Sequence, residues 1–109
     1  MPTPTLQVHF YRSDTGTEPV REWLKDLSAA DRKIIGEDMK TVQYGWPLGM
    51  PLVRKMSANL WEVRINLQNR IARVLFTVEG DMMILLHGFI KKSQQTPTAD
   101  LKTAMNRLK

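Results

Sequence analysis

The sequence predicts an α+β domain in which two helices near the N-terminus pack on a mainly antiparallel sheet of four to five strands. A short helix closes the chain. Apolar residues recur at helical spacing over residues 20–42, β-prone runs joined by tight polar turns fill residues 52–90, and helical spacing returns over residues 96–109. Because helices and strands are grouped along the chain, an antiparallel sheet is favoured over a parallel one.

The first half of the chain is expected to form one strand and two helices. Residues 7–11 are a short β-prone run that ends before the turn residues 13–16. One helix face is then formed by Val20, Trp23, Leu24 and Leu27. Ser28 and Asp31 have the spacing of a capping box, which begins a second helix that ends near Gly45. The inward face of this second helix is formed by Ile35, Met39 and Val42.

Four strands are expected in the second half. Residues 52–56 suit a short edge strand, and residues 60–65 alternate between the two faces of a sheet. After a polar turn over residues 66–69, residues 70–78 form a second run rich in β-branched side chains. Residues 82–90 are almost continuously apolar, which suits a central strand covered on both faces.

The last element is expected to be a helix over residues 96–109. Thr96 offers a hydroxyl for the N-cap, and Pro97 suits the first helical position. The apolar face of this helix is predicted to consist of Leu101, Ala104, Met105 and Leu108.

Length and composition indicate one cytoplasmic domain that spans residues 1–109. A chain of this length buries about two-thirds of its unfolded surface, which is enough for a core without metals or disulfides. The absence of cysteine excludes structural disulfides and thiolate metal sites and fits a reducing compartment. Residues 1–5 lack the basic and apolar regions of a signal peptide, and no run approaches the ~18 apolar residues of a membrane span.

The positive charge is concentrated in the second half of the chain. Residues 1–51 carry six Lys/Arg and seven Asp/Glu, whereas residues 52–109 carry ten Lys/Arg and four Asp/Glu, a net charge of +6. Clustered positive charge indicates a nucleic acid or an acidic protein partner. The alternative is a solvated basic surface without a specific ligand.

The predicted strands bring cations together around one carboxylate. Glu62 and Arg64 share a strand face, Arg73 lies on the next strand, and Lys91 and Lys92 end the strand after that. Arginine binds phosphate oxygens bidentately, and lysine adds a compact charge, so this group could bind RNA and stabilise the charge that develops during cleavage. Further phosphate contacts are expected from Arg54, Lys55 and Arg70. The alternative is a salt-bridged sheet surface in which Glu62 pairs with Arg64 or Arg73.

Other catalytic templates are not present. The chain lacks a glycine-rich phosphate loop, and no cluster of ligands suits a metal, so no cofactor is expected. The two histidines, His9 and His87, are far apart in the sequence, and His87 is expected to be a satisfied core residue of its strand. Trp23 and Trp61 are expected to anchor the core rather than stack on bases.

Three ordered motifs suggest a family. Residues 60–65 (LWEVRI), 73–76 (RVLF) and 86–97 (LHGFIKKSQQTP), followed by a helix with Ala104 and Arg107, resemble the phage-derived HigB-type toxins of the RelE/ParE superfamily. The resemblance extends over residues 7–107. It implies the RelE-like fold, with two N-terminal helices on an antiparallel sheet and a short C-terminal helix.

The resemblance also implies an activity, since these toxins are typically endoribonucleases that cut messenger RNA in the ribosomal A site. The implied reaction is a metal-independent attack of a ribose 2′-hydroxyl on the neighbouring phosphate. Arg73 and Lys92 match transition-state cations, and Arg64 matches a phosphate-positioning residue. Residues 97–99 depart from RelE-type enzymes, which carry a tyrosine there, so the general base is open. Glu62 is the candidate base, and its alternative role is to orient Arg64 or Arg73.

The implied partners are the ribosome with its mRNA and a cognate helix-turn-helix antitoxin, in a toxin–antitoxin heterotetramer. Two other functions stay open at this point. The ParE branch of the superfamily shares the fold and inhibits DNA gyrase without catalysis, and a plain basic nucleic-acid-binding module is the third alternative.

Overall fold

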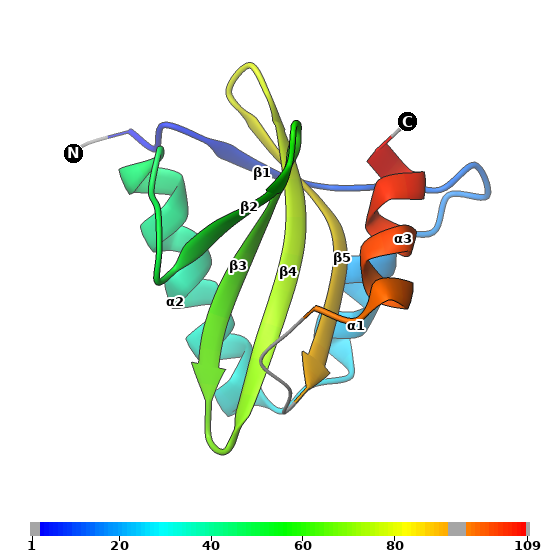
Figure 1. The fold of residues 1–109 in the computed structure, drawn as a ribbon. Helices are drawn as coiled ribbons and strands as arrows, with labels where there is room; N and C mark the ends of the chain where they lie inside the picture. Colours follow the sequence, from blue (N-terminus) through cyan, green and yellow to red (C-terminus); the bar gives the residue numbers. More distant parts are fainter. Residues whose placement is uncertain (1–2, 92–95, 109) are drawn as a thin grey trace.

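A mixed sheet with helices on both faces forms the structure (Figure 1). This computed structural model describes residues 3–91 and 96–108. The elements in chain order are β1 (Gln7–Phe10), α1 (Pro19–Lys25), α2 (Ala29–Gly45), β2 (Val53–Ser57), β3 (Leu60–Leu67), β4 (Arg70–Glu79), β5 (Met82–Lys91) and α3 (Thr98–Leu108). The five strands lie in the order β1-β5-β4-β3-β2, with β1 parallel to β5 and the other neighbours antiparallel. The predicted α+β class is confirmed, and the arrangement is consistent with a RelE-like fold.

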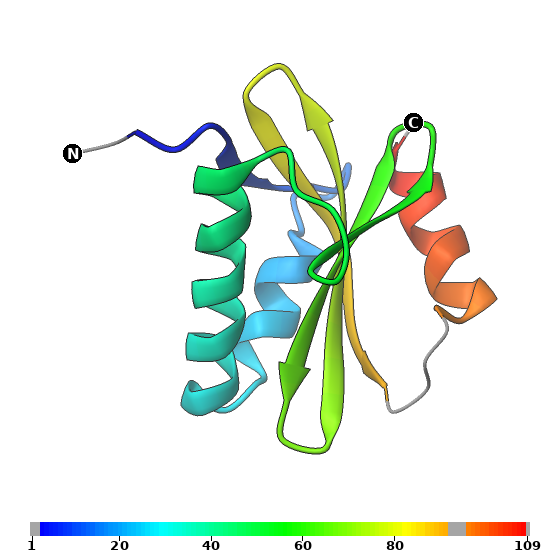
Figure 2. The same cartoon turned by 60° about the vertical axis from the view of Figure 1, so that its left-hand side comes forward.

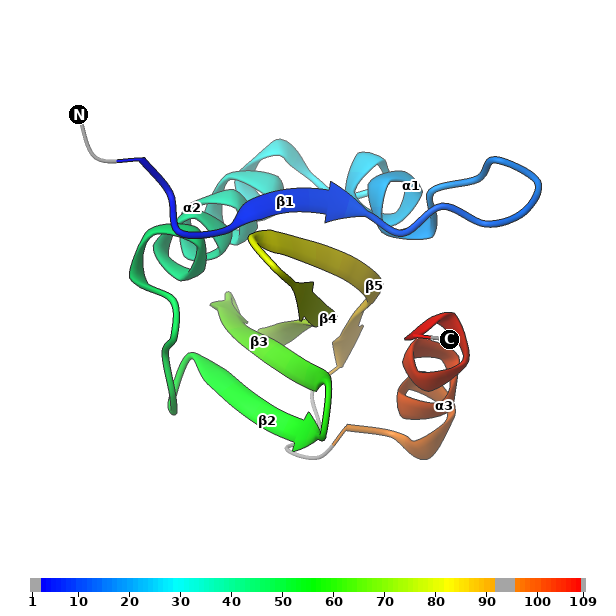
Figure 3. The same cartoon turned by 90° about the horizontal axis from the view of Figure 1, so that it is seen from above.

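Helices α1 and α2 cover one face of the sheet, and α3 covers part of the other, which we call the α3 face (Figures 2 and 3). The larger core lies under α1 and α2 and includes the three predicted α2 residues, Ile35, Met39 and Val42. The smaller core lies on the α3 face and consists of Leu60, Leu75, Leu86, Phe89 and Ala104. Because strands β3, β4 and β5 bury side chains on both faces, they are rich in apolar residues.

The predicted start and end of α2 are confirmed. The Ser28 hydroxyl accepts a hydrogen bond from the backbone N–H of Asp31 at 3.1 Å, as an N-cap does, and the helix ends at Gly45. At 17 residues α2 is the longest described helix. Within residues 3–91 and 96–108, no helix combines the length and the apolar character needed to cross a membrane.

A β-bulge in β5 changes which side chains reach the α3 face. Leu75 of β4 pairs with His87, but the next residue, Phe76, pairs with Leu85, so Leu86 is an extra residue on β5. Leu85 belongs to the core under α1 and α2, whereas Leu86 belongs to the core on the α3 face. The bulge therefore lets two consecutive residues, Leu86 and His87, contribute to the α3 face.

Three local expectations differ from the structure. Strand β3 continues to Leu67, so the turn is reduced to residues 68 and 69, and Asn69 adopts the left-handed conformation that the tight turn requires (φ 58°). Helix α3 begins at Thr98 rather than at Thr96, because the hydroxyl of Thr96 is bound to the sheet. Met105 is 41% exposed, because only a narrow stripe of this lone helix, centred on Ala104, contacts the sheet.

Aromatic residues anchor the core under α1 and α2, as expected for Trp61 and Trp23. The Trp61 ring stacks with Phe76 at a centroid distance of 6.0 Å and meets Trp46 edge-on at 5.2 Å. The Trp23 ring of α1 lies directly against Gly88 of β5. The close approach of α1 to the sheet thus depends on the missing side chain at position 88.

We predict that Gly88→Ala destabilises the protein by about 1–3 kcal/mol, the usual effect of overpacking. An added Cβ would lie 2.5 Å from Cζ3 of Trp23, so the indole and α1 must move. Gly36→Ala is the matched control, because a Cβ at this exposed position of α2 meets no atom within 4 Å. The control should stabilise the helix by about 0.5–1 kcal/mol. Urea unfolding of both variants measures the difference, and equal stabilities would contradict the prediction.

Candidate functional site

Three arginines and one glutamate come together on the α3 face of the sheet. Arg54 of β2 lies opposite Glu62 of β3, and Arg64 of β3 lies opposite Arg73 of β4. Glu62 and Arg64 are two residues apart on β3 and alternate with Val63 of the opposite core, so both leave the sheet on the α3 face. We call Arg54, Glu62, Arg64 and Arg73 the arginine–glutamate cluster. The structure thus brings together the residues that the strand pattern placed near one another.

Glu62 and Arg73 form a fully buried ion pair within this cluster. Both side chains have 0% exposure, and Nη1 of Arg73 lies 3.9 Å from Oε2 of Glu62. The hydroxyl of Thr96, at the entrance to α3, connects them, because it accepts a hydrogen bond from Nη1 of Arg73 at 3.1 Å and donates one to Oε2 of Glu62. Oε1 of Glu62 is buried and has no hydrogen-bond partner among the described residues.

The electrostatics of Arg73 reflect this position. Burial lowers the pKa of Arg73 below its ordinary value, and the charge of Glu62 acts in the opposite direction. The charges of Arg64 and Arg54 lower the pKa of Arg73 further. The carboxylate of Glu62 therefore stabilises the charged form of Arg73 next to the two other cations, Arg64 and Arg54. A buried guanidinium such as that of Arg73 is tolerated only when it is paired.

Exposure ranks the three arginines by their access to a ligand. Arg54 is exposed, Arg64 is half-buried and Arg73 is covered. A phosphate in solution can therefore reach Arg54, whereas Arg64 is only partly accessible. It cannot contact the covered Arg73 in this conformation, which differs from the transition-state contact that the family resemblance implies for Arg73.

Two of the cations expected to bind phosphate lie away from the cluster. The guanidinium of Arg70 donates from Nη2 to both carboxylate oxygens of Asp31 of α2, each at 3.1 Å, so it braces the β3–β4 turn against the helix. Lys55 pairs with Trp61 in the register, and its Nζ lies 5.9 Å from the centre of that ring. Strand alternation separates Lys55 from Arg54, because consecutive residues point to opposite faces.

The two lysines at the end of β5 are only partly described. Lys91 is the last residue of the strand and pairs with Ile71 of β4. Lys92, a predicted catalytic cation, lies outside the described residues.

His87 links the sheet to α3 instead of packing within an apolar strand. Its Nε2 lies 2.7 Å from Oδ1 of Asp100, and its Nδ1 lies 3.4 Å from Nη1 of Arg107. Because a guanidinium can only donate, Nδ1 accepts from Arg107 and the Nε2 proton points to Asp100. Arg107 also donates to the carbonyl of Leu86, the extra residue of the bulge, at 2.8 Å. The expectation of a satisfied histidine is confirmed, but its partners come from α3.

Three residues shape this region through contacts that the sequence did not predict: Thr96, Asp100 and Arg107. A sequence signal existed for two of them, since Asp100 and Arg107 are seven residues apart and fall on the same helix face as Ala104. Thr96 carried no signal beyond its match to a helix cap.

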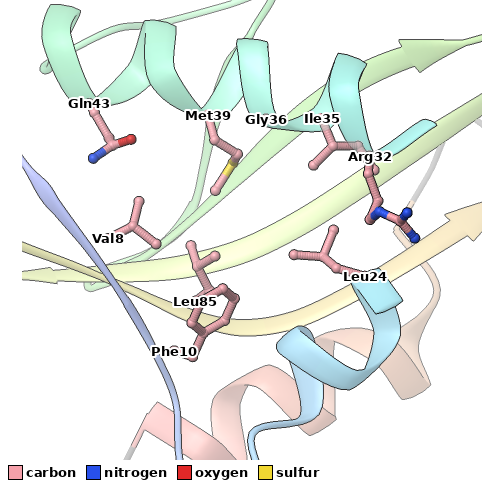
Figure 4. Close-up of a pocket in the computed structure, with 9 residues that line it drawn as sticks. All are labelled: Val8, Phe10, Leu24, Arg32, Ile35, Gly36, Met39, Gln43 and Leu85. Atoms are coloured by element: carbon pink, nitrogen blue, oxygen red, sulfur yellow. The ribbon is translucent and has the colours of Figure 1, made fainter. Parts of the chain in front are cut away.

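An apolar cavity of about 320 Å³ lies on the opposite face, between α1, α2 and β1 (Figure 4). Its polar lining residues are Arg32 and Gln43, and the side chains of both form hydrogen bonds with backbone carbonyls. Arg32 donates to the carbonyls of Lys25 and Leu27, and Gln43 donates to the carbonyl of Leu6. Among the described residues, the lining of the cavity thus contains no carboxylate, and its one cation, Arg32, is bound to backbone carbonyls. The α3 face is therefore the stronger candidate for a catalytic site.

The fold and the cluster define a small RelE-like α+β protein with a cationic sheet face. The model of the family phage-derived protein Gp49-like (DUF891) matches residues 22–109, which include every residue of the cluster. The chain belongs to this family, which is of the RelE/HigB-like toxin type. No curated protein sequence matches the chain.

Proposed function

We propose that this protein is the toxin of a type II toxin–antitoxin system, a HigB-type endoribonuclease that cleaves messenger RNA on the ribosome and arrests translation. The observation that carries the proposal is the arginine–glutamate cluster, in which the exposed Arg54 and the half-buried Arg64 lie beside a buried Arg–Glu pair. Membership in the Gp49-like family and the net charge of +5 support it.

In the proposed reaction a ribose 2′-hydroxyl loses its proton to solvent, its oxygen bonds to the adjacent phosphorus, and the bond from this phosphorus to the 5′-oxygen of the next nucleotide breaks. The products are a 2′,3′-cyclic phosphate and a 5′-hydroxyl that takes a proton from solvent. Negative charge on the phosphate oxygens increases in the transition state. Arg64 and Arg54 bind these oxygens, since arginine forks match them bidentately. Arg73 adds positive charge from the position opposite Arg64 on the neighbouring strand. Lys92 as a transition-state cation and Lys91 as a phosphate contact are proposed from the sequence motif alone. Preorganised cations of this kind stabilise charge that develops during reaction.

Glu62 is assigned the orienting role rather than that of general base. Its side chain is covered, and Oε2 is already bound to Thr96 and close to Arg73. A carboxylate in this position holds a guanidinium in place and does not meet a substrate hydroxyl in the same conformation. Orientation of the RNA by the ribosome would supply much of the rate enhancement.

The proposed partners are the ribosome with its mRNA and a cognate helix-turn-helix antitoxin that assembles with the toxin into a heterotetramer in the cytoplasm. An antitoxin that presents carboxylates to Arg54 and Arg64 would complement their charge.

Induced expression of the protein is expected to stop protein synthesis, with new mRNA 5′ ends inside translated codons. The same mapping in a purified translation extract separates direct cleavage from secondary decay. Arrest with intact transcripts and a DNA-damage response would contradict this function and favour the gyrase inhibition known in the ParE branch.

A further inference from the structure

The hydroxyl of Thr96 occupies a defined place between the two buried charges of the cluster. Arg73 can only donate hydrogen bonds, and an ionised Glu62 can only accept them. The Thr96 hydroxyl does both, since it accepts from Nη1 of Arg73 and donates to Oε2 of Glu62. The direction of both bonds is therefore fixed by the chemistry of the partners.

The direct contact of the ion pair is long, and the Thr96 hydroxyl adds a hydrogen-bonded link between the two side chains. The 3.9 Å between Nη1 of Arg73 and Oε2 of Glu62 exceeds the reach of a hydrogen bond. Arg64 and Arg54 also repel the Arg73 guanidinium. The bond from Arg73 to Thr96 at 3.1 Å is thus a directional contact that holds the guanidinium toward Glu62.

A helix-capping role does not account for Thr96. The first backbone bond of α3 runs from the N–H of Leu101 to the carbonyl of Pro97 at 3.1 Å, so Pro97 takes the N-cap place. The Thr96 hydroxyl is directed to the sheet instead. Contacts of Asp100 and Arg107 with the bulge of β5 dock α3, and this docking delivers Thr96 to the ion pair.

We propose that Thr96 is a positioning residue for the RNA cleavage proposed above: its hydroxyl bridges Arg73 and Glu62 and so fixes the Arg73 guanidinium opposite Arg64. The inference rests on the proposed function. It assigns to Thr96 an effect on the rate of the chemical step, with little effect on binding, because the Arg73 that it holds is buried, whereas Arg54 of the same cluster is exposed and Arg64 is half-buried.

The test compares Thr96→Val, which removes the hydroxyl, with Thr96→Ser, which keeps it. The cleavage rate of mRNA on purified programmed ribosomes should fall about 100-fold in Thr96→Val, the usual effect of displacing a catalytic group by about 1 Å. Thr96→Ser should restore most of the rate, and KM should change little in either variant. Thr98→Val, the same substitution at an exposed position of α3, is the matched control and should cleave as the wild type does.

Each result supports or overturns the inference. Rates are compared per folded protein, and Thr96→Ala replaces Thr96→Val if the valine variant does not fold. A variant without the hydroxyl that cleaves as fast as the wild type, or faster, overturns the positioning role, and so does a serine variant that is as slow as Thr96→Val. If the wild-type protein leaves mRNA intact, the proposed function is wrong and the inference with it. This result differs from the variant results above, which overturn the inference alone.

Discussion

Replacing Arg73 by alanine is expected to lower the free energy of unfolding by about 3–5 kcal/mol, because the change leaves the Glu62 carboxylate buried without its cation. Both side chains have 0% exposure, so the carboxylate has no direct contact with bulk solvent that could compensate its charge. A domain of this size has a total stability of about 5–15 kcal/mol, so the variant should be partly unfolded at 37 °C. Urea unfolding followed by circular dichroism measures the loss.

Two controls separate the buried charge from other effects. Removing both charges in Glu62→Leu/Arg73→Met should recover most of the stability, since an apolar replacement of a whole buried pair is often neutral. Arg70→Ala breaks a pair that is 36% exposed on the arginine side, and the expected loss is at most about 1 kcal/mol. Equal stability of Arg73→Ala and Arg70→Ala would contradict the prediction. Because Arg73→Ala is expected to be partly unfolded, a loss of toxicity in this variant would not show that Arg73 takes part in catalysis.

The cluster itself was predictable because local rules determine it. Alternation along β3 places Glu62 and Arg64 on one face, and the tight turn at residues 68 and 69 sets the register that brings Arg73 opposite Arg64. The strand period can be inferred from a short segment of sequence. The turn length was not, since the turn expected over residues 66–69 is reduced to residues 68 and 69, and the exact partner of Arg64 is therefore known only from the structure.

The burial and the partners of the cluster depend on contacts between distant segments. Arg70 has the same local character as Arg73, but Asp31, 39 residues away in sequence, binds its guanidinium. Thr96 matches a helix cap in sequence and becomes a bridge only because α3 docks on the β5 bulge. Strand period and propensity carry no information about such docking, which is why the covered state of Arg73 was not foreseen.

Arg64→Ala is expected to reduce mRNA cleavage on ribosomes by about 10²–10³-fold, the usual effect of removing one donor that stabilises developing charge. Arg64 is half-buried on the α3 face and lies opposite Arg73 in the register. The sheet fixes the backbone of Arg64, and we propose that its guanidinium group binds the phosphate. Arg64→Lys should fall between wild type and alanine, because lysine keeps the charge and loses the bidentate geometry.

Lys40→Ala removes the same charge from an exposed position of α2 and should cleave as the wild type does. The rate is measured per folded protein in a purified translation system. Wild-type cleavage by Arg64→Ala would show that Arg64 does not contact the reacting phosphate, and the proposed site would then be wrong.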